Sequence, residues 1–257
     1  MPTPPDPSDP TDPRGLYVYA IAAPGTAAHA ERCRAVGDEG AVVSVLSRDG
    51  LAAVVSAVSG RPRARRRDLS AHQDVLCALA ENGPLLPMRF GVIAPDERTV
   101  LAGLDAARAD HLAALERLAG RAEWNVKGVP VPEALPDLLR EDASLRALRE
   151  TTRRRPGYEA NVRLGEAVAA GLQRRAERAA AEVVTELRPL AAELRGGRDV
   201  AGGVLNASFL VPCAAESAFR RAAYALATRY QGRIALTLTG PLPCYSFVTA
   251  EAVPAGA

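Results

Sequence analysis

Apolar residues recur along this chain with two different periods. In several short stretches, apolar and β-branched residues run together or alternate, which is typical of strands. We expect strands at residues 15–21, 40–47, 51–59, 85–93, 123–129, 204–211, 233–238 and 244–248. Asp49-Gly50, between two of these runs, predicts a hairpin because that turn needs positive φ angles. Pro87 interrupts another run and favours an edge or irregular strand there.

Other stretches repeat apolar residues every three or four positions, which predicts helices with one buried face. We expect helices at residues 27–36, 71–81, 96–118, 133–150, 158–194 and 214–230. Ser70 is placed to cap the second of them, and Asn82-Gly83-Pro84 to end it. The helix that begins at Tyr158 would be about 55 Å long if it were continuous, and Pro189 should kink or end it.

These elements predict an α+β fold with two α/β domains, the C-terminal one ferredoxin-like, and a long helical hairpin between or beside them. We expect a disordered Pro/Asp-rich tail at 1–13, an N-terminal α+β domain at 14–130, a helical segment at 131–201 that contains the long helix 158–195, strands and a helix at 202–250 that complete the ferredoxin-like domain, and a tail at 251–257.

Composition argues against several classes of function but does not identify one. Of the 257 residues, 48% are hydrophobic and 24% are charged, as in ordinary globular proteins. The net charge of +2 is too balanced to favour nucleic acid or an anionic membrane as partner. No apolar run approaches the ~18 residues that would span a bilayer. The four cysteines lack zinc-site spacing, and the first 13 residues are not an apolar leader, so we expect a cytoplasmic protein with free thiols.

No constellation of residues predicts catalysis, a metal site or a cofactor. His29, His72 and His111 lack the convergent partners of a catalytic base, and we interpret them as surface or cap-stabilising side chains. The chain contains no P-loop, no G-x-S-x-G, no H-E-x-x-H and no G-x-G-x-x-G after a strand. The basic run at residues 61–67 lacks aromatic residues that could stack on bases, so a solvated loop is favoured over a contact with phosphates or an acidic partner.

Two residues indicate packing or protein contacts rather than catalysis. Arg89 lies inside the apolar run 85–93, where a guanidinium must either pair with a carboxylate of its own domain or face a partner. The residues alone leave both alternatives open. Trp124, the only tryptophan, is expected in the core.

The segment from Gly240 to Phe247 contains Gly-Pro-x-Pro between two runs that look like strands. This pattern predicts a rigid turn at Gly240, Pro241 and Pro243. We expect the turn to close the C-terminal sheet and to seat Tyr245 and Phe247 in the core.

Six segments, in order along the chain, resemble the gas vesicle protein L/F family (GvpL/GvpF), and the chain is identified as an actinomycete-type member. They are residues 15–20 (GLYVYA), 86–91 (LPMRFG, similar to P-x-R-F-G), 123–127 (EWNVK), 163–168 (RLGEAV), 204–211 (VLNASFLV, similar to N-A-x-x-L-V) and 238–248 (LTGPLPCYSFV, similar to G-P-W-P-P-Y-S-F). Leu242 stands where the family often has tryptophan, and Cys244 where it often has proline. These departures remove a large apolar anchor and loosen the turn.

The resemblance implies a non-enzymatic accessory or minor structural protein of gas vesicles, without a cofactor. Their wall is built from a small, very hydrophobic shell protein, which is prone to aggregate before assembly. We therefore expect a cytoplasmic, gas vesicle associated protein that binds the shell protein and other accessory proteins during nucleation and assembly. Arg89 and Phe90 are the expected partner-binding residues, because they lie on an edge-like strand broken by Pro87. Gly240, Pro241, Pro243, Tyr245 and Phe247 are the expected structural signature.

Two other classes of function stay open at this point. One is a small-molecule-binding regulatory or enzymatic ferredoxin-like protein, which would need a deep polar pocket near residues 240–243. The other is a helical scaffold that self-associates through the long helix.

Overall fold

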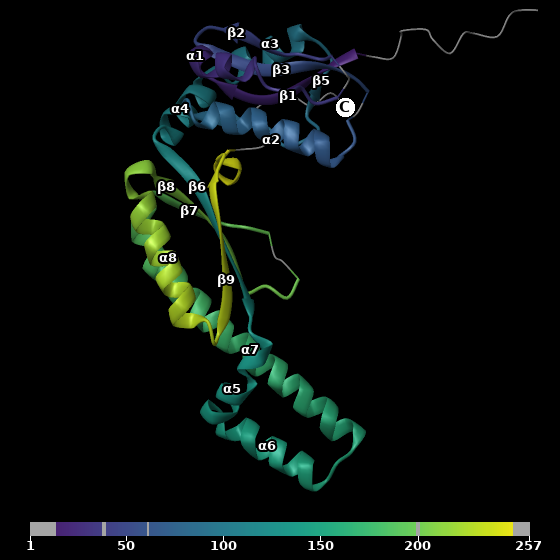
Figure 1. Cartoon of the computed structure of the whole chain (residues 1–257), viewed down its shortest axis with the longest axis vertical. Helices are drawn as coiled ribbons and strands as arrows, with labels where there is room; N and C mark the ends of the chain where they lie inside the picture. Colours follow the sequence, from purple (N-terminus) through teal and green to yellow (C-terminus); the bar gives the residue numbers. More distant parts are fainter. Residues whose placement is uncertain (1–13, 38–39, 61, 199–200, 249–257) are drawn as a thin grey trace, which may run out of the picture. The chain divides into compact units, whose positions relative to one another are not determined.

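The computed structural model describes residues 14–37, 40–60, 62–198 and 201–248 of the chain (Figure 1). Helices are mixed with two antiparallel sheets, which confirms the predicted α+β class. The chain divides into two compact units. The first unit combines Met1–Ala122 with Leu242–Ala257, and the second unit spans Glu123–Pro241.

The first unit is built on a five-stranded sheet with β1 near its centre. Its strands are β1 (Arg14–Ala22), β2 (Val43–Arg48), β3 (Leu51–Ser59), β4 (Leu85–Pro87) and β5 (Ile93–Ala94). The order is β2-β3-β1-β4, and β5 also pairs with β1. Asp49 and Gly50 have φ angles of 46° and 83°, which confirms the predicted hairpin between β2 and β3. β4 ends the strand order, as the proline at position 87 predicts.

The helices of the first unit differ from prediction in where they begin and end. They are α1 (Pro24–Ala27), α2 (Arg66–Ala80), α3 (Glu97–Ala106) and α4 (Arg108–Leu118). Instead of a helix over 27–36, α1 passes into a single 3-10 turn at Ala28–Ala30. The physical reason is tertiary, because the Val36 N–H donates to the buried Tyr19 hydroxyl at 2.7 Å rather than to a helical carbonyl.

Two further helix boundaries are corrected. α2 begins four residues before Ser70, and no side chain caps it. The single helix expected over 96–118 is broken at Ala107, whose φ of −114° leaves the helical region. The start of this pair is as predicted, because the Asp96 carboxylate accepts from the Thr99 N–H at 2.7 Å.

The second unit has the strand order and connections of a ferredoxin-like fold. Its strands are β6 (Arg121–Pro130), β7 (Glu193–Gly196), β8 (Leu205–Pro212) and β9 (Ile234–Leu242), in the order β7-β8-β6-β9. α7 (Tyr158–Leu187) leads from β6 to β7, and α8 (Glu216–Tyr230) leads from β8 to β9. This β-α-β-β-α-β sequence with two inner strands, β8 and β6, is the split βαβ arrangement.

The core of the second unit lies between this sheet and the helices α7 and α8 (Figure 1). Alternate residues of β8 enter the core, including Phe209, whose ring centroid lies 5.2 Å from that of Phe219 on α8. Trp124 of β6 is 3% exposed and packs in the same cluster, which confirms its predicted place in a core. α7 contributes mainly small residues, which allow the helix backbone to approach the sheet closely.

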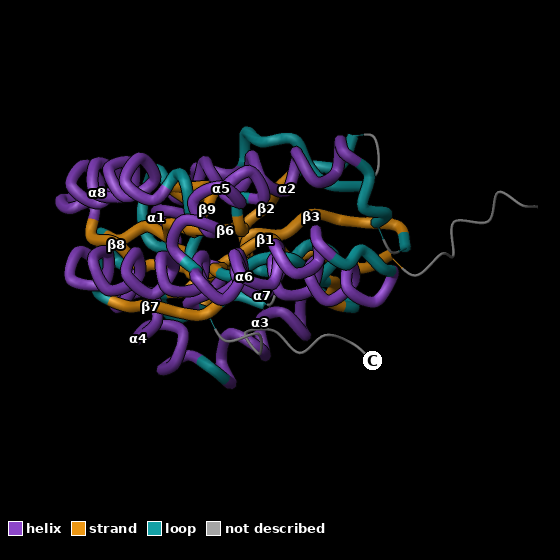
Figure 2. Tube along the Cα trace, turned by 90° about the horizontal axis from the view of Figure 1, so that it is seen from below, coloured by secondary structure: helices purple, strands orange, loops and turns teal. Residues whose placement is uncertain are grey.

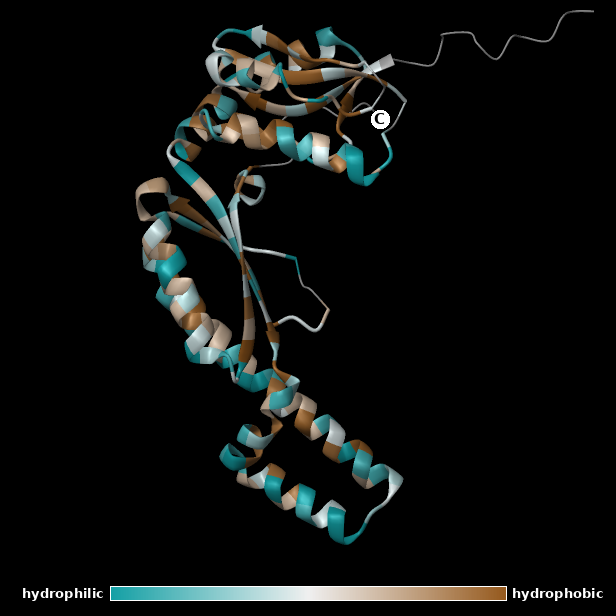
Figure 3. Cartoon of the chain, viewed as in Figure 1, coloured by the Kyte–Doolittle hydropathy of each residue, from teal (hydrophilic) through white to brown (hydrophobic). Residues whose placement is uncertain are grey.

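Two short helices are inserted between β6 and α7. They are α5 (Leu135–Glu141) and α6 (Ala143–Arg154), preceded by a 3-10 turn at Pro132–Ala134. α6 packs against α7, and the two helices lie side by side in both views (Figures 1 and 2). We call α5, α6 and residues 158–170 of α7 the helical arm. Hydrophobic and hydrophilic positions are mixed along its helices, whereas the strands of the first unit are mostly hydrophobic (Figure 3).

The structure places the expected domain boundaries elsewhere. β6, assigned from the sequence to an N-terminal domain ending at 130, forms an inner strand of the second sheet. The helical segment 131–201 and the strands that follow it form one unit with β6, because α7 packs on the sheet that they complete. Residues 242–248 belong to the first unit. The expected tails at 1–13 and 251–257 lie outside the described residues.

Three predictions for the C-terminal half of the chain are corrected. The long helix ends at Leu187, and after a 3-10 turn that contains Pro189 the chain forms β7, a strand that the helical pattern did not predict. β9 continues through Gly240 and Pro241, whose peptide bond is cis, so the expected turn is part of a strand. The expected last strand at 244–248 is a 3-10 turn at Tyr245–Phe247.

Candidate partner-binding site

Two tyrosines of β1 form the centre of the candidate site in the first unit. Tyr17 and Tyr19 are fully buried, and their ring centroids lie 4.8 Å apart in an edge-to-face arrangement. The Tyr19 hydroxyl accepts from the Val36 N–H at 2.7 Å and is hydrogen-bonded to Ser56 Oγ at 2.9 Å. Burial raises the pKa of both tyrosines, so both hydroxyls stay protonated and available as hydrogen-bond donors.

His72 of α2 connects these tyrosines to the end of the chain. Its Nδ1 is hydrogen-bonded to the Tyr17 hydroxyl at 2.9 Å and its Nε2 to the Tyr245 hydroxyl at 3.2 Å. The side chain is 4% exposed, and burial lowers the pKa of His72 to about 4. The imidazole is therefore neutral near pH 7, and a tyrosine hydroxyl can act as donor or acceptor toward either ring nitrogen. This corrects the expectation of a surface or cap-stabilising histidine.

The P-x-R-F-G-like segment follows β4 and wraps around the same tyrosines. The Met88 N–H donates to the Tyr19 carbonyl at 2.8 Å, and the Gly91 N–H donates to the Tyr17 hydroxyl at 3.3 Å. The Phe90 ring is half-buried, with its centroid 5.8 Å from those of Tyr17 and His72. The backbone of this segment is thus held by β1 on both sides of Phe90.

Arg89 lies beside Phe90 and is exposed. Within the part of the chain that the structure describes, its guanidinium makes no ion pair. The two alternatives that the sequence leaves open were an internal salt bridge and a surface facing a partner. The described residues supply no carboxylate for an internal salt bridge. The alternative to test is therefore that Arg89 faces a partner.

The closing segment, residues 245–247, packs in the same unit as these tyrosines although it lies near the other end of the sequence. Tyr245 is half-buried against the first unit's core and bonds to His72, while Phe247 is 3% exposed and its carbonyl accepts from Arg117 Nη2 at 2.5 Å. Tyr245 and Phe247 are therefore seated in a core, as expected, but in that of the first unit rather than in the C-terminal sheet. We call Tyr17, Tyr19, His72, Phe90 and Tyr245 the signature cluster.

Gly240 has a separate structural role inside the second unit. Its φ is 156°, and a Cβ added there would lie 2.7 Å from Cδ2 of the Trp124 indole. Only glycine lets the strand pass this close to the ring. Pro243 and Cys244 are buried. This close packing offers no support for the deep polar pocket that a small-molecule-binding or enzymatic function would need at these residues.

Reasoning from the sequence did not identify His72 as the residue that joins the P-x-R-F-G-like segment to the closing segment. The available signal was the alternation of Tyr17 and Tyr19 on one strand, which places two hydroxyls on the same face and requires buried partners for both. The residues that pair with them, His72 and Tyr245, are 55 and 228 positions from Tyr17, so only the fold brings them together.

The described part of the chain contains no group of three or more His, Cys, Asp or Glu side chains that could hold a metal ion. Cys33, Cys77, Cys213 and Cys244 form no disulfide among the described residues. No described helix combines the length and the apolar character needed to cross a bilayer.

Comparison with known proteins gives consistent matches over most of the chain. The model of the family described as "Gas vesicle synthesis protein GvpL/GvpF" matches residues 15–249. Gas vesicle protein F of Streptomyces sp. (strain CB03234) is 38% identical over 235 residues, which cover 90% of this chain and 98% of the relative. Gas vesicle protein L of the same organism is 30% identical over 251 residues, covering 90% and 91%.

Solved structures agree with these sequence matches. The crystal structure of the gas vesicle protein GvpF from Anabaena sp. PCC7120 has a TM-score of 0.74 and 26% sequence identity, and the match covers 91% of this chain and 98% of that one. The crystal structure of GvpF from Microcystis aeruginosa has a TM-score of 0.69 and covers 91% and 99%. At 21% identity, the second match supports the fold alone.

Proposed function

This chain belongs to the GvpL/GvpF family of gas vesicle synthesis proteins, and from that premise we propose that it binds the hydrophobic shell subunit while the vesicle is nucleated and assembled. It acts in the cytoplasm and associates with the vesicle and with other accessory proteins there. The family is one of gas vesicle accessory or structural proteins rather than a known enzyme family.

One observation supports the site of this contact. The P-x-R-F-G-like segment and the closing segment meet at His72, which contacts the half-buried rings of both Phe90 and Tyr245. Arg89, next to Phe90 in the sequence, is exposed. Arginine and aromatic residues are enriched among the side chains that dominate binding energy at protein interfaces. We propose that the partly exposed edge of Phe90 contacts apolar surface of the shell subunit, while Arg89 orients the contact through a carboxylate or carbonyl of that subunit.

The rigid support of this edge is part of the proposal. Met88 and Gly91 hold the backbone on either side of Arg89 and Phe90 through bonds to β1. A side chain presented from a fixed backbone loses less conformational freedom when it binds, so more of its contact energy appears as affinity.

Co-purification tests the proposal directly. The tagged chain is expressed together with the shell subunit, and the amount of shell subunit recovered is compared between wild type and Arg89→Ala/Phe90→Leu. We expect at least a tenfold loss of recovery. Phe90→Leu keeps an apolar side chain against His72, and thermal unfolding of the double variant verifies that the first unit is folded. Arg98→Ala, at another exposed arginine of the first unit, is the matched control and should leave recovery unchanged.

The two ways in which this proposal can fail are distinguishable. If wild type recovers no shell subunit, the proposed binding function is wrong. If wild type recovers it and Arg89→Ala/Phe90→Leu recovers it equally well, the function stands and the site is elsewhere.

A further inference from the structure

The segment between β4 and β5 contains more residues than the part of β1 that it faces. Both strands lie on the edge of β1 that β3 leaves free. β4 pairs with β1 at Pro87 and Ala20, and β5 pairs with it at Ile93 and Tyr17. Two residues of β1 lie between these pairs, whereas five, residues 88–92, lie between them on the other side. The three extra residues leave the strand alignment as a bulge, and we call residues 88–92 the bulge loop.

Backbone hydrogen bonds hold the two ends of the bulge loop on β1. The Met88 N–H donates to the Tyr19 carbonyl at 2.8 Å, and the Val18 N–H donates to the Val92 carbonyl at 3.0 Å. The Val92 N–H also donates to the Arg89 carbonyl, at the longer distance of 3.4 Å. The sheet therefore fixes where the loop begins and ends.

The Tyr17 hydroxyl supplies a partner for the middle of the loop. It accepts from the Gly91 N–H at 3.3 Å, and it is itself bonded to His72 Nδ1 at 2.9 Å. Gly91 has a φ of 90°, and a Cβ added there would meet no atom within 4 Å. The packing of a side chain thus does not set the position of Gly91. The hydroxyl of a fully buried tyrosine is placed to do so.

The position of Gly91 bears on the residues that precede it. The Phe90 ring is half-buried, and its centroid lies 5.8 Å from those of Tyr17 and His72, edge-on to both. Arg89 is exposed. Holding the Gly91 amide at Tyr17 therefore keeps Phe90 against the signature cluster while Arg89 stays in solvent.

From this geometry we infer that Tyr17 is a positioning residue for the contact that Arg89 and Phe90 make. The inference rests on the function proposed above and adds to it a residue that is too deeply buried to touch the partner. Tyr17 holds the bulge loop in its binding conformation before the partner arrives, so less conformational freedom is lost on binding. Tyr245 supports it through His72, one hydrogen bond further from the loop.

The test compares Tyr17→Phe with Tyr19→Phe. Tyr17→Phe keeps the ring and removes the acceptor of the Gly91 N–H. Hydrogen exchange of the Gly91 amide, followed by NMR in the free chain, should become about fivefold faster. Recovery of the shell subunit in co-purification should fall about fivefold, the effect expected for one lost hydrogen bond.

Tyr19→Phe is the matched control on the same strand. Its hydroxyl is bonded to the Val36 N–H and to Ser56 Oγ, neither of which belongs to the bulge loop. The variant should therefore lower stability yet leave both the Gly91 exchange and the recovery within about twofold of wild type. A merely structural role of Tyr17 would give the two variants the same result.

A second variant approaches the same bond from the loop. Gly91→Ala places a Cβ on a residue with a φ of 90°, which strains the loop backbone without a clash against the cluster. It should also lower recovery of the shell subunit. Adding Tyr17→Phe to Gly91→Ala should lower recovery by less than about twofold more, because the two residues act through one contact.

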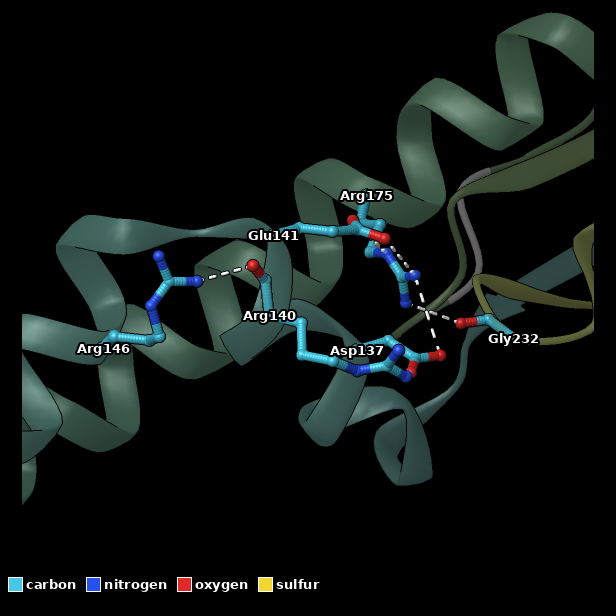
Figure 4. Close-up of polar contacts among 6 residues, drawn as sticks. All are labelled: Asp137, Arg140, Glu141, Arg146, Arg175 and Gly232. Carbon is cyan, nitrogen blue, oxygen red and sulfur yellow. Dashed lines mark hydrogen bonds and ion pairs between the residues drawn. The ribbon is translucent and has the colours of Figure 1, made fainter.

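A control in the second unit separates loss of the loop from a general loss of stability. The Arg175 side chain of α7 is 11% exposed and donates to both carboxylate oxygens of Glu141, at 2.8 and 3.0 Å, and to the Gly232 carbonyl at 2.7 Å (Figure 4). Arg175→Gln removes these bonds from the other unit. It should lower stability and leave the Gly91 exchange and the recovery within about twofold of wild type.

Contrary outcomes are specific. Unchanged exchange of the Gly91 amide in Tyr17→Phe, or an equal loss of recovery in Tyr17→Phe and Tyr19→Phe, overturns the inference. Additive losses in Gly91→Ala and Tyr17→Phe overturn it as well. If wild type recovers no shell subunit, the proposed function is wrong, and the exchange measurement, which needs no partner, still decides whether Tyr17 holds the loop.

Discussion

The signature cluster and the helical arm handle polar side chains in opposite ways. In the cluster, Tyr19 and His72 are buried and neutral, and each finds partners inside the first unit. In the arm, arginines are exposed and charged, and Tyr158 has 86% of its surface in solvent. This difference indicates that substitutions in the first region should lower the stability of the fold, whereas substitutions of exposed side chains in the second should change it little. Unpaired buried groups are costly, while exposed side chains contribute little to folding.

The largest expected effect concerns the pH dependence of the cluster. The pKa of His72 is lowered from 6.5 to about 4 in the folded chain, so the unfolded chain binds a proton that the folded chain does not. Stability from this group is therefore complete above pH 6.5 and is lost as the pH falls toward 4, by up to roughly 3 kcal/mol. Urea unfolding of wild type and His72→Gln at pH 7 and pH 4.5 measures it, and the variant should lose less stability between the two.

His29 supplies the matched control because it is exposed in the same unit. His29→Gln should keep the wild-type change of stability with pH. The same pH dependence in wild type and His72→Gln would show that His72 is not held neutral by burial, and the contrast between the cluster and the arm would lose its main support.

A pair of tyrosine substitutions compares the two regions directly. Tyr19→Phe removes a hydroxyl that is bonded to the Val36 N–H and to Ser56 Oγ, and it should lower the free energy of unfolding by about 1–3 kcal/mol. Tyr158→Phe removes an exposed hydroxyl and should change it by less than about 0.5 kcal/mol. Chemical denaturation of both variants provides the measurement, and similar losses in the two would break the comparison.

The smallest expected effect sharpens the contrast within α7 itself. A Cβ at Gly171 would lie 2.9 Å from Cδ2 of the buried Leu138, so Gly171→Ala should cost about 1 kcal/mol even after the gain in helix propensity. Gly165 faces open space, so Gly165→Ala should stabilise the chain by roughly 0.5–1 kcal/mol. The midpoints of urea unfolding should shift in opposite directions, and shifts of the same sign would contradict the packing of α5 against α7.

Much of the local structure could be predicted because it depends on neighbours in the sequence. The hairpin at Asp49-Gly50 follows from two residues that accept positive φ, and the Asp96 cap follows from a side chain three residues from the amide that it accepts from. The end of α7 before Pro189 is a property of one residue. The family resemblance likewise rests on short segments whose order alone is informative.

The predictions that were wrong concern segments whose structure depends on residues far apart in the sequence. The residues of β7 show little strand pattern by themselves, and they form a strand because they pair with β8. The helix expected after Ala27 yields to a hydrogen bond between Val36 and Tyr19. The break expected at Gly240 disappears because the strand is completed by its neighbour and passes over Trp124. In each case the long-range contact outweighs the local preference.

The sequence by itself determined the α+β class, most of the elements and the family of this protein. Only the tertiary structure decided that residues 242–248 belong to the first unit, and that His72 joins Tyr17 to Tyr245 there. It also decided that α7 is buried against the sheet along its second half, whereas Tyr158 and Val162 in its first half are exposed. The physical reason is that periodicity shows which face of an element is apolar, whereas the partner that covers that face is set by the packing of elements distant in sequence.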